Sequence, residues 1–143
     1  MKTNELISKR ESLISDIKKN WERIYAFNQV DKSKSHYNVD ALMKTIISDS
    51  IKLVGIKVAI QAANMGLKKI EDLPEDCIYP TIFALQQLKE QKVKLLGLKK
   101  YTTNGVISKK KIDGDLQEIN VEIDKLSEMI DNFNKDTDFK FEE

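Results

Sequence analysis

The sequence contains few residues that interrupt a helix. Its 143 residues include five glycines and two prolines, while 41% of the residues are hydrophobic and 33% are charged. Such a composition is typical of a strongly patterned helical protein, and it suits a sheet protein or a disordered chain less well. We therefore predict an all-α fold, and the length suits a single domain, residues 1–143, with one core.

Cysteine and histidine are also scarce, which excludes several kinds of site. Because Cys77 is the only cysteine and His36 the only histidine, the chain has no internal disulfide and no cluster of ligands for zinc. We expect Cys77 to be a small buried residue and His36 to lie in a solvated loop. No glycine-rich phosphate loop and no recognisable set of Ser, His and Asp is present either. We therefore predict no catalytic residues, no cofactor and no metal ion, and we expect that the protein is not an enzyme.

A long hydrophobic run is missing as well. The most apolar run, residues 53–63, is interrupted by Lys57 and Gln61, and a membrane-spanning helix needs about 20 apolar residues. Residues 1–18 carry a charge every few positions and lack the apolar core of a secretion signal. We expect no membrane span and a cytoplasmic location.

The chain does contain a regular apolar pattern in its last third. Six apolar residues recur there at alternating spacings of three and four: Leu116, Ile119, Ile123, Leu126, Ile130 and Phe133. Charged and polar residues occupy nearly all positions between them. This heptad pattern predicts a helix with one apolar seam, as in a coiled coil. Such a helix is stable only when partner helices cover the seam.

The other segments supply those partner helices. We predict four helices, at about 4–28, 38–65, 80–96 and 114–134. Asn38 and Asp113 are placed to cap the second and fourth helices, whereas Gly66 and Gly97 follow the second and third helices at positions where helices often end. Gly55 lies inside the second helix, where glycine costs about 1 kcal/mol relative to alanine, so we expect a close helix contact there. Together these segments predict a four-helix bundle-like arrangement.

The segment between the third and fourth helices, residues 98–111, loses the helical period. Asn104 and Gly105 form a dipeptide typical of a two-residue hairpin turn, and the β-branched residues Val106 and Ile107 follow it. We predict a small β-hairpin or a loop here, inserted between the last two helices.

Positive charge concentrates in and around this segment. Residues 91–112 contain seven lysines and no acid, whereas residues 113–143 contain eleven acids and three lysines. In one interpretation the basic stretch contacts phosphates or an acidic partner through Lys99, Lys100, Tyr101, Lys109, Lys110 and Lys111. In the other, the acidic helix that follows neutralises it. We favour the second interpretation because neither arginine, Arg10 or Arg23, lies in the stretch.

Three pieces of the sequence carry a family resemblance. They are the spacing of Leu, Arg and Ile in residues 6–24, the pair Ile60 and Asn64, and the set Ile130, Asn134 and Thr137. In this order the pieces resemble the septicolysin-like proteins, a family of small bacterial helical proteins. The chain departs from the family pattern at residues 78–88, which lack an Arg–Asp pair, and at Lys135, where an aromatic residue is common.

The resemblance implies a helical bundle that self-associates, and it makes Asn64 and Asn134 candidate family-linked positions. We favour capping of helix C-termini as the role of both asparagines. We expect a non-enzymatic protein that acts through self-association, as a homo-oligomer, or through binding of a protein partner to its apolar helix faces. One alternative is a membrane-active, cytolysin-like protein, as the family name implies. The other is a nucleic-acid or nucleotide-phosphate binder that uses the lysine-rich stretch.

Overall fold

The protein folds into four long α-helices. The computed structural model describes residues 1–29, 36–101 and 105–142, without the side chain of Tyr101. The elements of this part of the chain are α1 (Thr3–Phe27), α2 (Val39–Asn64), the 3-10 helix η1 (Ile70–Asp72), α3 (Tyr79–Tyr101) and α4 (Lys109–Asp136). The predicted all-α fold with four helices is therefore confirmed.

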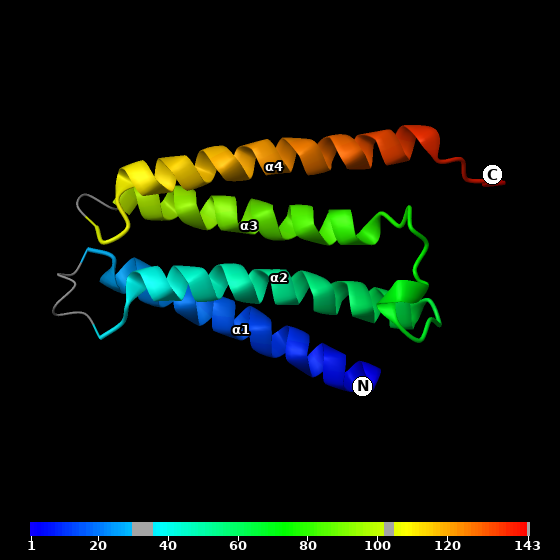
Figure 1. The fold of residues 1–143 in the computed structure, drawn as a ribbon, viewed down its shortest axis with the longest axis horizontal. Helices are drawn as coiled ribbons and strands as arrows, with labels where there is room; N and C mark the ends of the chain where they lie inside the picture. Colours follow the sequence, from blue (N-terminus) through cyan, green and yellow to red (C-terminus); the bar gives the residue numbers. More distant parts are fainter. Residues whose placement is uncertain (30–35, 102–104, 143) are drawn as a thin grey trace.

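The helices form two hairpins that lie side by side (Figure 1). α2 packs against α1 and α3, and α3 packs against α2 and α4. Helices α2 and α3 are therefore the inner pair, while α1 and α4 lie on the outside (Figure 1). α1 and α4 each bury one apolar stripe, whereas α2 and α3 each contact two other helices.

Both ends of α2 use the signals present in its sequence. The side-chain oxygen of Asn38 accepts a hydrogen bond from the N–H of Ala41 at 3.1 Å, so Asn38 is the predicted cap. Gly66 has a φ of 81°, and the N–H groups of Gly66 and Leu67 donate to carbonyls in the last turn of the helix. This is the Schellman arrangement, which favours glycine because a Cβ disfavours positive φ.

The connection between α3 and α4 differs from the prediction. α3 continues to Tyr101, and α4 begins at Lys109 with Ser108 as its cap; the side chain of Ser108 accepts from the N–H of Lys111 at 3.1 Å. The predicted cap at Asp113 was therefore wrong by one turn or more. Residues 105–108 contain no strand, and 98–101 and 109–111 are helical, so the described part of the chain does not support a β-hairpin. Asn104 of the predicted turn lies outside the described residues.

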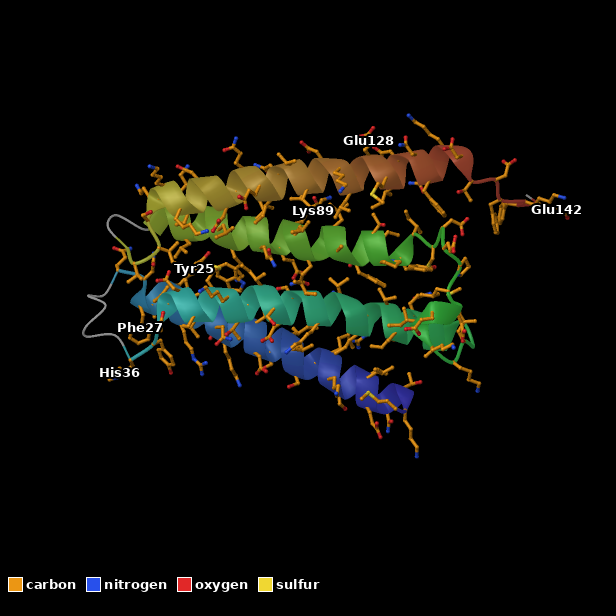
Figure 2. All side chains as sticks on the ribbon, viewed as in Figure 1. Tyr25, Phe27, His36, Lys89, Glu128 and Glu142 are labelled. Carbon is orange, nitrogen blue, oxygen red and sulfur yellow. The ribbon has the colours of Figure 1, made fainter. Side chains whose placement is uncertain are left out.

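Packing explains why Gly97 does not end α3. A Cβ added at Gly97 would collide with the side-chain hydroxyl of Tyr25 from α1. That hydroxyl donates a hydrogen bond to the carbonyl of Lys94, and Tyr25 lies between the two hairpins in Figure 2. One residue later, Leu98 is 2% exposed. Continuing the helix buries Leu98, which offsets the cost of an internal glycine of about 1 kcal/mol.

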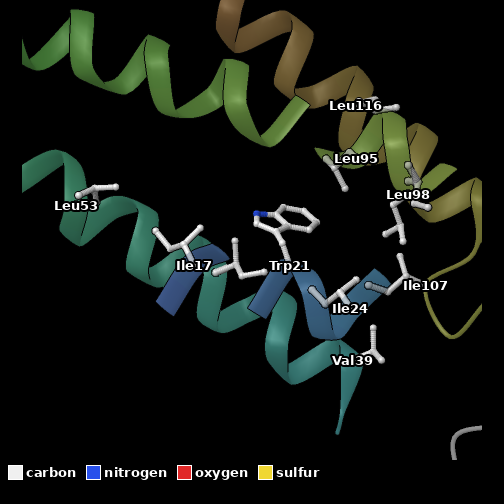
Figure 3. Close-up of a cluster of buried hydrophobic side chains, with 11 residues drawn as sticks. Ile17, Trp21, Ile24, Val39, Leu53, Leu95, Leu98, Ile107 and Leu116 are labelled. Atoms are coloured by element: carbon white, nitrogen blue, oxygen red, sulfur yellow. The ribbon is translucent and has the colours of Figure 1, made fainter. Parts of the chain in front are cut away.

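One apolar core joins all four helices at the end of the molecule where α1 ends and α4 begins. Its buried residues are Ile17, Trp21, Ile24, Val39, Ile46, Leu53, Leu95, Leu98, Ile107, Ile112 and Leu116. Figure 3 shows Trp21 in the middle of this group. Ile24, Ile46 and Ile112 have no exposed surface. We call this group the four-helix core.

A second core lies farther along α3 and α4. Leu85 of α3 is buried with Ile123 and Leu126 of α4, and half-buried apolar residues of the same two helices surround them. Within the described ranges, no residue of α1 or α2 belongs to this group, which we call the two-helix core. The heptad seam of α4 is therefore buried as predicted, but α3 alone provides the core partners of its C-terminal half.

A buried asparagine connects the end of α1 to the segment before α4. Asn28, directly after α1, is 0% exposed. Its Oδ1 accepts from the N–H of Ile107 at 2.7 Å, and its Nδ2 donates to the carbonyl of Ile107 at 3.2 Å. Its backbone carbonyl accepts from the N–H of Val106 at 2.7 Å. A single residue thus satisfies the backbone polar groups of the segment before α4, as a neighbouring strand would. Gly105 permits this approach, because a Cβ there would collide with the Asn28 amide.

Candidate functional site

The lysines singled out in the sequence gather where α3 ends and α4 begins. Two lie in the last turn of α3, at Lys99 and Lys100, and three form the first turn of α4, from Lys109 to Lys111. The side chain of Tyr101 lies outside the described part of the structure. The structure therefore brings the lysines to one end of the molecule, as their sequence positions suggested.

Acids at the start of α4 pair with two of these lysines. Nζ of Lys99 lies 2.5 Å from an Asp113 carboxylate oxygen, and Nζ of Lys111 lies 2.7 Å from one of Asp115. Both pairs are on the surface, where such an interaction contributes about 1 kcal/mol or less. The contacts nevertheless agree with the interpretation that the acidic helix neutralises the basic stretch.

Carboxylates from two helices surround Lys111. The hydrogen bond that Nζ of Lys111 donates to Asp115, and then the charge of Asp115, raise the pKa of the Lys111 amine, and the charges of Glu118 and Asp40 act in the same direction. Asp40 belongs to the first turn of α2, whereas Asp115 and Glu118 belong to α4.

The two candidate asparagines do not form a common site. Asn64 is the last residue of α2 and Asn134 lies in the last turn of α4, and both are exposed. Among the described residues only a glycine, Gly66, has positive φ. Neither asparagine therefore caps a helix in the left-handed conformation, so that predicted role is wrong. Asn64 lines a shallow cavity with Arg10 and Phe83, and no residue of α4 lines it.

The remaining candidate residues are dispersed. Cys77 is half-buried and not fully buried as predicted, and His36 is exposed with its ring 6.4 Å from that of Phe27, at the end of the molecule seen in Figure 2. Across residues 1–29, 36–101 and 105–142, no three His, Cys, Asp or Glu side chains are grouped to hold a metal ion. In the same ranges, no helix is long and apolar enough to cross a membrane.

The surface between α2 and α4 combines exposed apolar side chains with a cavity. The cavity has a volume of about 140 Å³ and is lined by Trp21, Met43, Ile46, Ile47, Gln91, Leu95, Asp115, Glu118 and Ile119. All four helices thus contribute to it. Along α2 the apolar surface continues from Ile47 to Ile51, one turn later, and these side chains are 47% and 69% exposed. We call the cavity with this extension the α2–α4 groove.

Helical spacing defines the α4 side of the groove. Glu122 and Met129 lie on the same side of α4 as Glu118, at spacings of four and eleven residues. Met129 is 46% exposed. The groove therefore has apolar walls and an acidic rim on α4, and its floor reaches Trp21 in the four-helix core.

A larger cavity, of about 680 Å³, lies at the opposite end of α2. It is bounded by the first residues of α1, small residues of α2 and the turn after α2, with Lys2, Lys68 and Lys69 among its lining residues. All three lysines are exposed. No buried polar group of the described chain marks this cavity as a binding site.

The groove could not be read from the sequence. Ile47 and Ile51 have the periodicity of core residues, and only the packing of α2 shows that they stay exposed. No protein-family model matches the sequence, and searches of curated proteins and of solved structures gave no significant match. The resemblance to septicolysin-like proteins therefore stays a prediction.

Proposed function

We propose that the protein is a non-enzymatic binding protein whose α2–α4 groove takes up an amphipathic helix with basic flanks from a partner protein. The observation that carries this proposal is the exposure of Ile47 and Ile51, 47% and 69%, beside a cavity that leads to Trp21. Single exposed apolar residues are ordinary on a protein surface. Two that lie one turn apart and adjoin an apolar cavity fit the helix-in-groove mode of recognition.

The cavity in the groove is deep enough to hold one anchoring side chain of a partner helix. Binding energy at interfaces concentrates in a few side chains that fill well-packed pockets. The cavity volume of about 140 Å³ accommodates one large apolar side chain, and its floor includes Leu95, which is 3% exposed. A partner helix would place one side chain here and a second one or two turns later, against Ile51.

The rim supports a basic partner over a second copy of this chain. Residues 113–143 contain eleven acids against three lysines, and Asp115 and Glu118 line the groove itself. A symmetric dimer through this groove would bring two acidic α4 helices together, which repulsion between like charges disfavours. Lysines or arginines flanking the apolar face of a partner helix would instead be attracted to the rim.

A pair of synthetic peptides tests the proposal. Both form amphipathic helices with leucines at heptad positions a and d, and one carries lysines on the flanks where the other carries glutamates. Fluorescence anisotropy of the labelled peptides measures their binding. At low salt the lysine peptide should bind at least about tenfold more tightly than the glutamate peptide. The difference should shrink as added salt screens the charges.

Two variants with matched exposure provide the control. Ile51→Asp places a charge in the groove, whereas Val93→Asp changes a residue of α3 that is 67% exposed, against 69% for Ile51. We expect Ile51→Asp to weaken binding of the lysine peptide about tenfold or more and Val93→Asp to leave it unchanged. Equal binding by both variants and the unaltered protein would contradict the proposal.

Native mass spectrometry separates partner binding from self-association. A monomer that binds the lysine peptide supports the proposed function. A dimer that dissociates in Ile51→Asp and persists in Val93→Asp would assign the groove to a second copy and overturn the choice of a basic partner. The cytolysin-like activity implied by the family resemblance has its own test, leakage of liposomes with the purified protein.

A further inference from the structure

Two phenylalanines after α4 are the most exposed large apolar side chains in the described part of the chain. Phe139 is 83% exposed and Phe141 is 76% exposed. Both belong to residues 137–142, which form no helix or strand and extend beyond the end of α4, with Glu142 near the tip in Figure 2. Burial of both rings would be favourable, because it would remove a large apolar surface from water.

The spacing of residues 137–142 separates apolar from charged side chains. Phe139 and Phe141 are two residues apart, so an extended backbone places them on the same side. The other side then carries the charged residues Asp138, Lys140 and Glu142. Thr137, at the start, has the extended values of φ −96° and ψ 119°. We call residues 137–142 the aromatic segment.

The cavity of about 680 Å³ at the end of α2 has complementary properties, and we call it the α1–α2 cavity. Half of its lining residues are apolar, namely Leu6, Ala59, Ala62, Ala63, Leu67 and Ile70. Its charged lining residues are all basic: Lys2, Lys68 and Lys69. Among the described residues no acid lines it, although α1 and η1 carry the acids Glu5, Glu71 and Asp72. The start of α1 belongs to the cavity too, and the N-terminal end of a helix attracts negative charge.

Size and charge both suit the aromatic segment. Apolar cavities of about 150 Å³ hold one benzene ring, so a cavity of about 680 Å³ accommodates two phenyl rings. The three lysines are exposed, and their long side chains can reach carboxylates that stay at the mouth of the cavity. The α2–α4 groove suits this segment less well, because its own rim is acidic.

The arrangement of the helices favours the cavity of a second copy over that of the same chain. α4 packs on α3, α3 on α2 and α2 on α1, so two helices lie between α4 and the α1 wall of the cavity (Figure 1). Neighbouring helices are about 8–10 Å apart, which puts that wall roughly 24–30 Å from α4. Six extended residues span only about 20 Å.

We propose that the protein forms a dimer in which each copy inserts Phe139 and Phe141 into the α1–α2 cavity of the other. The aromatic segment and the cavity lie at the same end of the molecule (Figure 1). Two copies that meet at this end can therefore exchange their segments reciprocally, which closes the assembly. Two six-residue segments bury less surface than a standard interface, so we expect a weak dimer that forms as the protein is concentrated.

Sedimentation equilibrium at rising protein concentration tests the exchange. Replacing both rings, Phe139→Ser with Phe141→Ser, should raise the dissociation constant of the dimer at least about tenfold. Val121→Ser is the control, because Val121 is a 65% exposed residue of α4 that does not line the cavity; it should leave the constant unchanged. A protein that stays monomeric, or a dimer that survives the loss of both rings, would overturn the proposal.

Charge reversal tests the cavity in the same measurement. Lys68→Glu with Lys69→Glu should weaken the dimer about tenfold, because the reversed charges repel the acids of the aromatic segment. Lys109→Glu with Lys110→Glu changes the net charge equally at the opposite end of the molecule and should have little effect. Equal weakening by both pairs would show a general effect of net charge and would overturn the assignment of the cavity.

A rescue variant joins the two surfaces. Asp138→Lys and Glu142→Lys, added to the variant with the reversed cavity, should restore the dimer, because each reversed segment then meets a reversed cavity. A dimer that stays weak would contradict the pairing of segment and cavity. Ile51→Asp should dimerise normally, so this proposal and the proposed function of the α2–α4 groove can fail independently.

Discussion

The seam of α4 is buried by different partners in its two halves. Ile112 and Leu116, 0% and 8% exposed, belong to the four-helix core, where every helix contributes side chains. Ile123 and Leu126, both 9% exposed, belong to the two-helix core of α3 and α4. The heptad pattern is the same in both halves. The pattern therefore requires burial of the seam, and it leaves open how many helices bury it.

On α2, burial differs between the faces of the helix within the region of the four-helix core. Where α4 and α2 both meet the four-helix core, α2 buries Ile46 completely. Ile51 lies between Ile46 and Leu53, which both belong to the four-helix core, yet it is 69% exposed. The apolar surface on which the proposed function rests therefore lies beside the four-helix core, on the face of α2 that the other helices leave uncovered.

The largest expected effect separates the two cores directly. Ile112→Ala removes a side chain with no exposed surface from the four-helix core, and we expect a loss of about 3–4 kcal/mol in the free energy of unfolding. Ile123→Ala removes the same group from the two-helix core, where partial exposure allows the site to relax, and should cost about 2 kcal/mol. Urea denaturation followed by circular dichroism measures both. Equal losses would show that the cores are energetically equivalent.

The next effect concerns the hydrogen bonds between Asn28 and Ile107. Asn28→Ala leaves the N–H and the carbonyl of Ile107 without their side-chain partner, and we expect it to cost about 2–3 kcal/mol. Asn20→Ala is the control, because Asn20 is also buried but its side chain accepts only a local bond from Arg23; it should cost about 1 kcal/mol. Hydrogen exchange at the Ile107 amide should accelerate in the first variant. An unchanged exchange rate would argue against the hydrogen bonds between Asn28 and Ile107.

A smaller effect tests how loosely α2 is packed away from the four-helix core. The close helix contact predicted at Gly55 is absent: a Cβ there would meet no atom within 4 Å. Gly55→Ala should therefore stabilise the protein by about 0.5–1 kcal/mol. Gly66→Ala, at a φ of 81°, should instead destabilise it by about 1 kcal/mol. Thermal denaturation measures both signs, and a destabilising Gly55→Ala would reveal a contact with a partner.

The smallest effect concerns the surface charges in the first turns of α4. Asp115 raises the pKa of Lys111 above its ordinary value of 10.5. A raised pKa in the folded protein stabilises it below the unfolded value, and this contribution disappears as the pH rises through the folded value. Lys111 is 66% exposed and Asp115 is 22% exposed, so solvent screens the pair and Asp115→Asn should cost about 0.2–0.5 kcal/mol at pH 7. Urea denaturation should show the difference vanishing as the pH rises through the raised pKa of Lys111, and a constant difference would contradict the pairing.

Local signals predicted much of the fold. The seam from Leu116 to Phe133 became the buried face of α4, Asn38 became a cap, and Gly66 ended α2 in the left-handed conformation. These features depend on residues within one or two turns of each other, so a sequence contains them directly. The helix end predicted at Gly97 was wrong for the opposite reason, because tertiary packing of Leu98 extended α3 to Tyr101.

The candidate sites were less predictable than the fold. The lysines near Lys99 and Lys111 were visible as a charge cluster, and their acidic partners lie close enough in sequence to be anticipated. Asn28 carried no signal, because an asparagine after a helix is common on protein surfaces. Only the tertiary structure buries it, at 0% exposure.

The sequence by itself determined four helices, their apolar faces and most of their ends, because periodicity and capping act over a few residues. Only the tertiary structure decided which faces met. It buried Ile46 and left Ile51 exposed, although both lie on apolar stripes of one helix. It also set Asn28 against Ile107, 79 residues away. Such contacts depend on how helices cross in space, and helices with similar apolar faces can cross in more than one way.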